Sequence, residues 1–188
     1  PPKNRGELFE QFIDLLIEKR GKISAKPDQP WIDEKVQKSA MAKLAFKMIL
    51  ERRGTSVDEL WVMDALNNLQ SDQDPKSLIY FAASAGIIES KRTGNKTNIR
   101  FTHQLLQEYF AALVMAEDVE KNESAVKYWP GDRWWEPTGW EETVMLLAGI
   151  QRDATDVVKW LTPINPTLAY RCATECGVPC DDEALNDL

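Results

Sequence analysis

The sequence has little of what marks exported or membrane-spanning proteins. It contains one histidine and three cysteines among 188 residues. No apolar run approaches the ~20 residues that a membrane-spanning helix needs, and no signal-peptide pattern opens the chain. An odd number of cysteines without a secretory signal is typical of reduced thiols in the cytoplasm. We therefore expect a cytoplasmic protein with no membrane partner.

The sequence also lacks the motifs of common catalytic sites. It has no G-x-x-x-x-G-K-[ST] loop and no strand that ends in an acidic pair for magnesium. Phosphoryl transfer needs both a phosphate cradle and a metal clamp. His103, the single histidine, has no nucleophile recognisable beside it. We therefore expect that the chain itself is not an enzyme and holds no cofactor alone.

The three cysteines, Cys172, Cys176 and Cys180, follow one another at intervals of four residues. Pro179 would end a helix before Cys180, so the three thiols are not expected on one helical face. There is no Cys-x-x-Cys pair and no nearby histidine, so no zinc site is predicted. We interpret the cysteines as small buried apolar residues.

The charge of the chain argues against nucleic acid as a partner. The net charge is −7, whereas binding to a phosphate backbone needs a cationic surface. A local exception is a predicted hairpin that carries four cations: Lys91, Arg92, Lys96 and Arg100. The preceding helix offers only Lys76, although base readout favours arginine, asparagine or glutamine. DNA binding through these four cations is therefore one alternative function of the chain.

Helical spacing of apolar residues predicts two helices early in the chain. The first covers 5–20, with Asn4 as its N-cap and Leu8 and Phe12 on its apolar face. A connector at 21–32 follows, and a second helix runs from Asp33 to before Gly54.

Capping signals predict two further helices. Ser56 with Glu59 three residues later forms a capping box, and the short helix behind it would turn Leu60 and Trp61 inward. After a polar loop at 69–74, Asp74 and Pro75 begin a helix that runs to about Ala85.

A hairpin and a long helix complete this part of the chain. The segments 87–92 and 97–101 are rich in β-forming residues and flank a turn that contains Gly94. Thr102 is the predicted N-cap of an amphipathic helix that reaches Ala116. The order of helices and hairpin predicts a winged-helix module over 32–118.

The last third of the chain is rich in tryptophan. It holds five of the seven tryptophans, so it needs a core of its own or an apolar neighbour: Trp129, Trp134, Trp135, Trp140 and Trp160. Helices are predicted around Val144 and over 153–161 and 166–176. The predicted fold class is mainly α: a helical bundle with a winged-helix module that carries one small β-hairpin.

Two segments carry a resemblance to a known family. Residues 101–112, FTHQLLQEYFAA, fit without a gap the F-x-H-x-x-x-Q-E-Y/F-F-A-A signature that closes the winged-helix domain of NACHT-type STAND NTPases. Residues 1–9, PPKNRGELF, resemble the L-P-x-N-R-x-E-L-Y/F segment of the same family, except that Pro1 replaces an apolar residue. The chain thus resembles bacterial NLR-like proteins just after their nucleotide-binding core.

The resemblance implies a division of the chain into domains and a function. It implies the end of a small helical domain at 1–31, a winged-helix domain at 32–118 and the start of a C-terminal superhelical region at 119–188. It also implies the regulatory arm of a signalling switch in which ADP holds a closed state and ATP permits opening and oligomerisation. His103 would contact the β-phosphate of ADP. Because the chain begins with Pro1 and not methionine, we expect it to be a protein fragment of a longer parent.

The implied partners lie within that parent. They are the nucleotide-binding domain of the same chain and further copies of the parent in a homo-oligomer. The parent would be a slow ATPase that uses ADP and ATP with magnesium. Besides a winged-helix DNA-binding module, a second alternative is a helical scaffold that binds another protein through its tryptophan-rich end.

Overall fold

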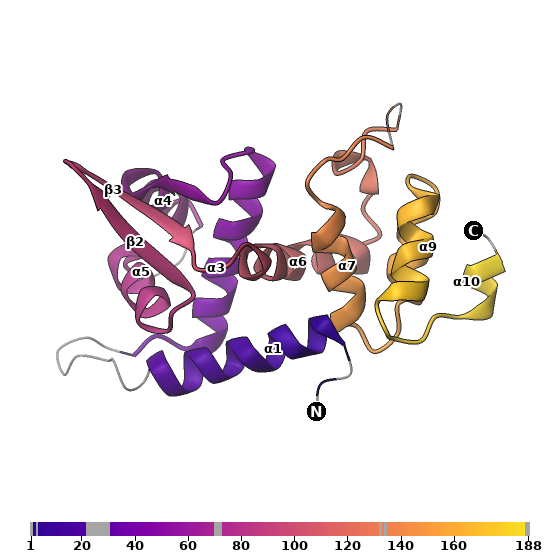
Figure 1. Cartoon of the computed structure of the whole chain (residues 1–188), viewed down its shortest axis with the longest axis horizontal. Helices are drawn as coiled ribbons and strands as arrows, with labels where there is room; N and C mark the ends of the chain where they lie inside the picture. Colours follow the sequence, from indigo (N-terminus) through magenta and orange to yellow (C-terminus); the bar gives the residue numbers. More distant parts are fainter. Residues whose placement is uncertain are drawn as a thin grey trace. The chain divides into compact units, whose positions relative to one another are not determined.

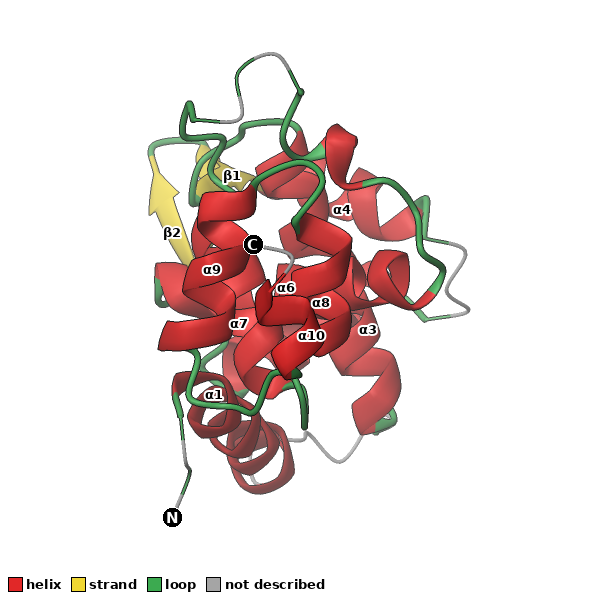
Figure 2. Cartoon of the chain, turned by 90° about the vertical axis from the view of Figure 1, so that its right-hand side faces the viewer, coloured by secondary structure: helices red, strands yellow, loops and turns green. Residues whose placement is uncertain are grey.

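Helices form most of this computed structural model, with one three-stranded antiparallel sheet (Figures 1 and 2). The fold is therefore mainly α with a small β element, as predicted. The structure describes residues 2, 4–21, 31–69, 73–131, 133 and 135–186. Most of the predicted connector at 21–32, the middle of the predicted loop at 69–74 and Trp134 lie outside these residues. No helix in the described ranges is both long and apolar enough to cross a bilayer.

The chain forms two compact units. One is Gln11–Ala111, and the other combines Pro1–Glu10 with Ala112–Leu188. The unit boundaries fall within two helices, α1 (Arg5–Leu15) and α6 (Gln104–Glu120). The division at 31/32 and 118/119 that the family resemblance implies stays a prediction.

The unit Gln11–Ala111 has the element order of a winged helix. A π-helical turn, η1, continues α1, so the single helix predicted over 5–20 changes its hydrogen-bonding pattern near its end. Among the described residues, three helices and three strands follow before α6. The elements after α1 are η1 (Leu16–Gly21), α3 (Glu34–Leu50), β1 (Ser56–Asp58), α4 (Glu59–Asn67), α5 (Pro75–Ser84), β2 (Ile88–Thr93) and β3 (Lys96–Phe101).

The sheet is built around β3, with β1 on one side and β2 on the other. In β2 and β3, Ile88 pairs with Phe101 and Thr93 with Lys96, which confirms the predicted hairpin. Gly94 follows β2 with a φ of 61°, as the first central residue of a type II′ turn requires. The buried strand residues Val57, Ile88, Ile99 and Phe101 lie on one face of the sheet, so this face covers the core of the unit.

The capping predictions differ in outcome. Asp74 caps α5 as predicted, because its Oδ2 accepts the Ser77 N–H at 3.0 Å. The prediction that Ser56 caps the next helix was wrong, because Ser56 begins β1 and pairs with Arg100. Asp58 caps α4 instead through the Leu60 N–H at 2.8 Å. The buried Val57 beside Ile99 explains the difference, since strand pairing gains both hydrogen bonds and apolar burial.

The start of α6 also lies later than predicted. His103 takes the N-cap position that was assigned to Thr102, and its carbonyl accepts the Leu106 N–H at 3.0 Å. Thr102 remains tied to the preceding sheet, because its N–H donates to the Ile87 carbonyl at 3.0 Å and its hydroxyl to the Gly86 carbonyl at 2.8 Å.

Of the two α4 residues predicted to face inward, Leu60 is exposed. Leu60 is 78% exposed, because the buried stripe of α4 is Val62, Ala65 and Leu66. At 100° per residue, Leu60 lies about 200° around the helix from Val62. Trp61 is half-buried, with the cations of Lys47 and Arg53 at 5.6 and 5.4 Å from its ring centroid.

The face predicted for α1 is only partly buried. Ile13, Leu16 and Ile17 are buried, whereas Leu8 and Phe12 are 49% and 41% exposed. The apolar residues of this helix therefore cover more of its circumference than the fold buries.

The second unit forms its own aromatic core. Trp129, Trp140 and Trp160 are buried around the ring of Tyr128, whose centroid lies 4.9 Å from that of Trp140. These side chains pack largely against one another, which meets part of the need for apolar partners inferred from the sequence. The elements of this unit after α6 are η2 (Ala125–Lys127), α7 (Glu141–Ile150), α8 (Thr155–Leu161), α9 (Pro166–Glu175) and α10 (Asp182–Asn186).

A polar network closes one side of this aromatic core. Asp118 accepts hydrogen bonds from the Tyr128 hydroxyl and from the Lys127 ammonium, the latter at 2.7 Å. Burial raises the pKa of Asp118, but the bonds from Lys127 and Tyr128 outweigh this effect and leave the pKa below its ordinary value. Burial and the neighbouring Asp118 carboxylate raise the pKa of Tyr128.

The network predicts a pH dependence of stability. A carboxyl group whose pKa is lower in the folded state stabilises the fold above its unfolded pKa, and this stabilisation disappears as the pH falls through the folded pKa. We expect Asp118→Asn to lower the free energy of unfolding by about 1–3 kcal/mol at neutral pH. The difference from the wild-type chain should shrink below about pH 4, near the ordinary aspartate pKa.

Urea unfolding followed by tryptophan fluorescence at several pH values would measure this difference. Glu117→Gln is the matched control, because Glu117 is the adjacent carboxylate on α6 and is exposed. It should change the stability by less than about 0.5 kcal/mol. An equal and pH-independent loss in both variants would contradict the role assigned to Asp118.

The start of α1 packs closely against the end of α7. The Asn4 side chain caps α1 as predicted, because its Oδ1 accepts the Glu7 N–H at 2.9 Å. Arg5 forms an ion pair with Glu142 of α7 at 2.8 Å. A Cβ atom on Gly6 would lie 2.5 Å from the carbonyl carbon of Gly149, so only glycine permits this approach.

This close contact predicts the effect of a single methyl group. We expect Gly6→Ala to destabilise the unit by about 1–3 kcal/mol, because backbone atoms cannot give way to the new side chain. Gly131→Ala is the control, since no atom lies within 4 Å of a Cβ built there. Denaturant unfolding of both variants tests the prediction, and equal stabilities would show that α1 does not hold this position against α7.

Candidate functional site

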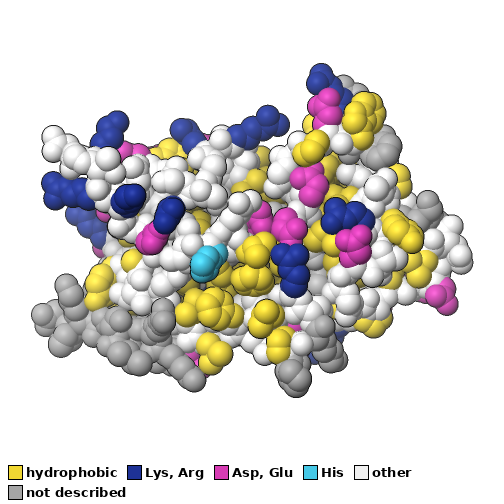
Figure 3. Space-filling view, in the orientation of Figure 1, with side chains coloured by type: hydrophobic (Ala, Val, Ile, Leu, Met, Phe, Trp, Pro, Cys, Tyr) yellow, Lys and Arg dark blue, Asp and Glu magenta, His cyan; other side chains and the backbone are white. Residues whose placement is uncertain are grey.

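His103 is the residue of the predicted site that packing does not explain. Within the F-x-H-x-x-x-Q-E-Y/F-F-A-A pattern, every other specified residue is buried, whereas His103 is exposed (Figure 3). Its carbonyl begins the hydrogen-bonding pattern of α6, but its imidazole faces outward from the fold. The side chain is therefore available for a contact outside this unit.

The buried residues of the same pattern have structural roles. The rings of Phe101 and Phe110 lie 6.0 Å apart, and both side chains are buried. The Gln107 amide donates to the Gly54 carbonyl at 3.2 Å, which fixes the loop after α3 where Gly54 has a φ of 71°. Ring packing therefore explains the aromatic residues at positions 101 and 110, and the bond to Gly54 explains the glutamine at position 107.

The position of His103 favours an anionic ligand. The N-terminal end of an α-helix carries partial positive charge and presents backbone N–H groups. An imidazole N–H beside that end can donate to a phosphate or carboxylate oxygen. The arrangement can hold an anion.

The hairpin of β2 and β3, which we call the wing, carries the four predicted cations Lys91, Arg92, Lys96 and Arg100. These cations do not form one cluster. Residues that pair across antiparallel strands share a face, so Lys91, Lys96 and Arg100 lie on the outer face of the sheet with Glu89 and Asp58. Arg92 lies on the opposite face near the turn, where its Nε donates to the Gly94 carbonyl at 3.3 Å.

Neighbouring carboxylates reduce the positive charge of the outer face. Arg100 forms an ion pair with Glu89, its direct partner across the strands. Three cations and two carboxylates leave one net positive charge there. This charge is small compared with the six to ten phosphate contacts that make DNA binding strong and salt-dependent.

The structure does not bring His103 and the tip of the wing together. Lys96 begins β3, Phe101 ends it, and His103 follows two residues later. At about 3.3 Å per residue, the strand separates Lys96 from Phe101 by about 16 Å. His103 and the wing tip are therefore separate features of the unit.

A groove beside α4, α5 and β2 was not predicted from the sequence. Its volume is about 470 Å³, and apolar side chains including Leu60, Ile79 and Ala83 line it together with Lys76 and Ser90. The exposure of Leu60 provides much of this apolar lining. Periodicity could not reveal the groove, because it depends on how α4 packs against α5 and β2.

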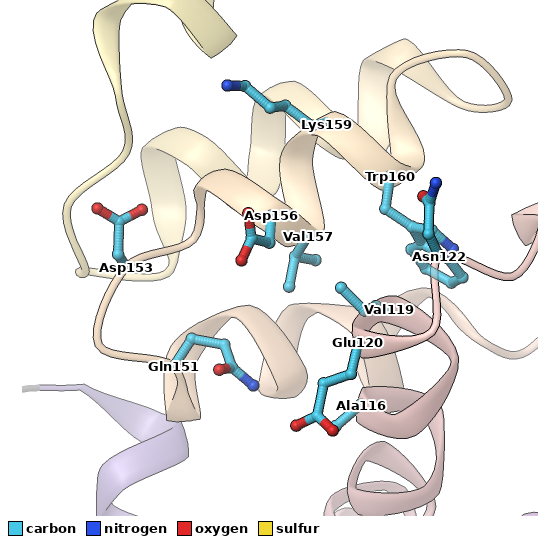
Figure 4. Close-up of a pocket in the computed structure, with 10 residues that line it drawn as sticks. All are labelled: Ala116, Val119, Glu120, Asn122, Gln151, Asp153, Asp156, Val157, Lys159 and Trp160. Carbon is cyan, nitrogen blue, oxygen red and sulfur yellow. The ribbon is translucent and has the colours of Figure 1, made fainter.

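The second unit has a more polar pocket of about 420 Å³ (Figure 4). Glu120 of α6 and Asp153 and Asp156 near the start of α8 supply three carboxylates to its lining. Lys159 also lines the pocket, but its ammonium extends away from the carboxylates of Asp156 and Glu120 (Figure 4). The pocket favours cationic over anionic groups, and His103 does not line it.

Comparisons with known proteins found no relative of the chain. No family model, curated protein or solved structure matches the chain. Within the described ranges, no group of three or more histidine, cysteine, aspartate or glutamate side chains is arranged to hold a metal ion.

The charge of the wing predicts weak DNA binding. We expect the chain not to shift a mixed-sequence duplex near physiological salt, with any Kd weaker than about 1 µM, which corresponds to about 8 kcal/mol. Electrophoretic mobility shift or fluorescence anisotropy would measure it. The double variant Lys91→Ala, Lys96→Ala should behave like the wild-type chain. Tighter binding that this double variant abolishes would instead support the DNA-binding alternative.

Proposed function

We propose that this chain is the regulatory arm of a NACHT-type STAND nucleotide switch in the cytoplasm. The main support is the contrast within residues 101–112, where the specified residues are buried except for His103. Packing and a hydrogen bond within the fold explain Phe101, Gln107 and Phe110. The exposed histidine needs another explanation, and a contact with nucleotide held by a neighbouring domain provides one.

In the proposed mechanism, His103 reports which nucleotide is bound. Its imidazole N–H donates to the β-phosphate of ADP in the nucleotide-binding domain of the same parent chain. Such a contact contributes about 1–3 kcal/mol to the closed state. Since 1.4 kcal/mol is a factor of ten, its loss raises an open population of about one per cent several-fold or more. ATP then favours opening and assembly into a homo-oligomer.

The proposal assigns no catalysis to this chain. Phosphate binding and magnesium coordination belong to the nucleotide-binding domain of the parent, which would hydrolyse ATP slowly. The contribution of this chain is a differential contact with two states of one switch.

The two alternatives make different predictions. A DNA-binding module would need the wing cations, of which Arg100 is already paired with Glu89. A helical scaffold for another protein would show no dependence on nucleotide and no role for His103. The response of a His103 variant to ADP therefore separates the proposal from both.

The first test concerns the isolated chain. We expect His103→Ala to change the free energy of unfolding by less than about 0.5 kcal/mol, because the side chain is exposed. Thermal melting followed by circular dichroism would measure this. A melting temperature far below that of the wild-type chain would make His103 a structural residue.

The decisive test uses the parent protein. His103→Ala should weaken ADP binding by roughly five- to 150-fold, the equivalent of about 1–3 kcal/mol, and should increase spontaneous oligomerisation. Lys96→Ala is the control, because Lys96 is an exposed residue of the same unit at the far end of β3. Unchanged ADP affinity in His103→Ala, or an equal loss in Lys96→Ala, would refute the nucleotide-sensing role.

A further inference from the structure

The groove beside α4, α5 and β2, which we call the α4–α5 groove, exposes apolar surface that its own unit does not cover. Leu60 lines this groove and is 78% exposed, although a leucine side chain is stabilised by leaving water. Met63, Ile79 and Ala83 supply further apolar lining. All four residues belong to the unit Gln11–Ala111, in which α4, α5 and β2 lie together (Figure 1). The groove therefore offers both a projecting apolar side chain and an apolar hollow.

The α4–α5 groove also carries one charge of each sign. Glu59 and Lys76 line it, the first half-buried and the second exposed. Among the residues that the structure describes, neither side chain has an ion-pair partner. The lining is thus neutral as a whole, although the net charge of the chain is −7. Two copies of a chain with this net charge repel each other in general, but this patch adds nothing to that repulsion.

The two charges lie toward opposite ends of the groove. Glu59 directly follows β1, which is joined through β3 to β2, the strand that carries Ser90. Glu59 therefore belongs to the end of the groove that is next to the sheet. Lys76 lies in the first turn of α5, seven residues before Ala83 at the end that leads into β2. At 1.5 Å per residue, this places Lys76 about 10 Å along the helix from Ala83.

A patch with these properties is complementary to itself. In an isologous dimer, a two-fold axis brings the same patch of two copies together, so that a contact from one residue to another occurs twice. An axis through the middle of the groove places each Glu59 opposite Lys76 of the other copy. It also places each exposed Leu60 against the apolar lining of the other groove. We propose that the α4–α5 groove binds a second copy of this chain and forms a two-fold symmetric dimer.

The two kinds of contact contribute in different ways. Exposed ion pairs add little affinity, so the Glu59–Lys76 contacts select the partner and its orientation. Burial of Leu60 and of the apolar lining drives the association. A peptide of one charge sign would pair with only one of the two charged residues, whereas a second copy pairs with both. The dimer needs neither nucleotide nor His103, so it goes beyond the switch function proposed above.

Sedimentation velocity and light scattering over a range of micromolar concentrations test the proposal. We expect the mass of the wild-type chain to rise with concentration from 21.4 kDa toward twice that value. Leu60→Asp should weaken dimerisation at least about tenfold, because one substitution removes two anchors from the interface. Leu50→Asp is the matched control, since Leu50 is a 54% exposed leucine of the same unit that does not line the groove. It should dimerise like the wild-type chain.

Charge reversal tests the two-fold arrangement itself. Glu59→Lys alone opposes lysine to lysine at both contacts, and Lys76→Glu alone opposes glutamate to glutamate. Each single variant should therefore be monomeric at concentrations where the wild-type chain is dimeric. An equal mixture of the two single variants should form a heterodimer, because both contacts then join a lysine to a glutamate. The chain that carries both changes should recover the homodimer for the same reason. Circular dichroism of each variant confirms that it is folded.

The proposal is overturned if the wild-type chain keeps the monomer mass at every concentration, or if Leu50→Asp weakens association as much as Leu60→Asp. It is also overturned if the folded single variants stay monomeric when mixed, because association then does not depend on the Glu59–Lys76 contact. A monomeric chain that binds a different protein through Leu60 would overturn it too. None of these measurements involves ADP or His103, so their outcome is independent of the proposed nucleotide-sensing role.

Discussion

The burial of α6 is the constraint on which the rest of the structure depends. All residues from Leu106 to Ala112 are buried, so the helix is apolar around most of its circumference over this stretch. A helix of this kind cannot face water and must be enclosed by other elements. The same helix continues as far as Glu120, so it supplies residues to the cores of both units. This requirement leaves little freedom for substitution in its middle and concentrates that freedom at its ends, where His103 lies.

Three predictions from local signals are confirmed, whereas a strand that depends on long-range pairing was not predicted. The cap at Asn4, the cap at Asp74 and the turn at Gly94 each depend on neighbouring residues, and all three are present in the structure. The strand β1 could not be predicted, because Ser56 with Glu59 is equally compatible with a capping box. Only the pairing of β1 with β3, more than forty residues later in the chain, decides between the two.

The candidate sites show the same division between local pattern and tertiary packing. His103 could be selected from the sequence through the family resemblance, but its exposure amid buried neighbours required the structure. The groove beside Leu60 was missed because it depends on how α4, α5 and β2 pack together, which no spacing rule predicts.

The surface of the unit Gln11–Ala111 differs from that of a DNA-reading winged helix. In a DNA-reading winged helix, the helix before the wing presents polar and cationic side chains to base edges. Here the corresponding helix, α5, has Lys76 as its single cation and contributes Ile79 and Ala83 to an apolar groove. The cations of the wing are offset by Glu89 and Asp58 on the same face of the sheet. Apolar walls contribute binding energy by excluding water, whereas binding to a phosphate backbone depends on an excess of cations. The described surface of this unit combines an apolar groove beside α5 with one net positive charge on the outer face of its sheet.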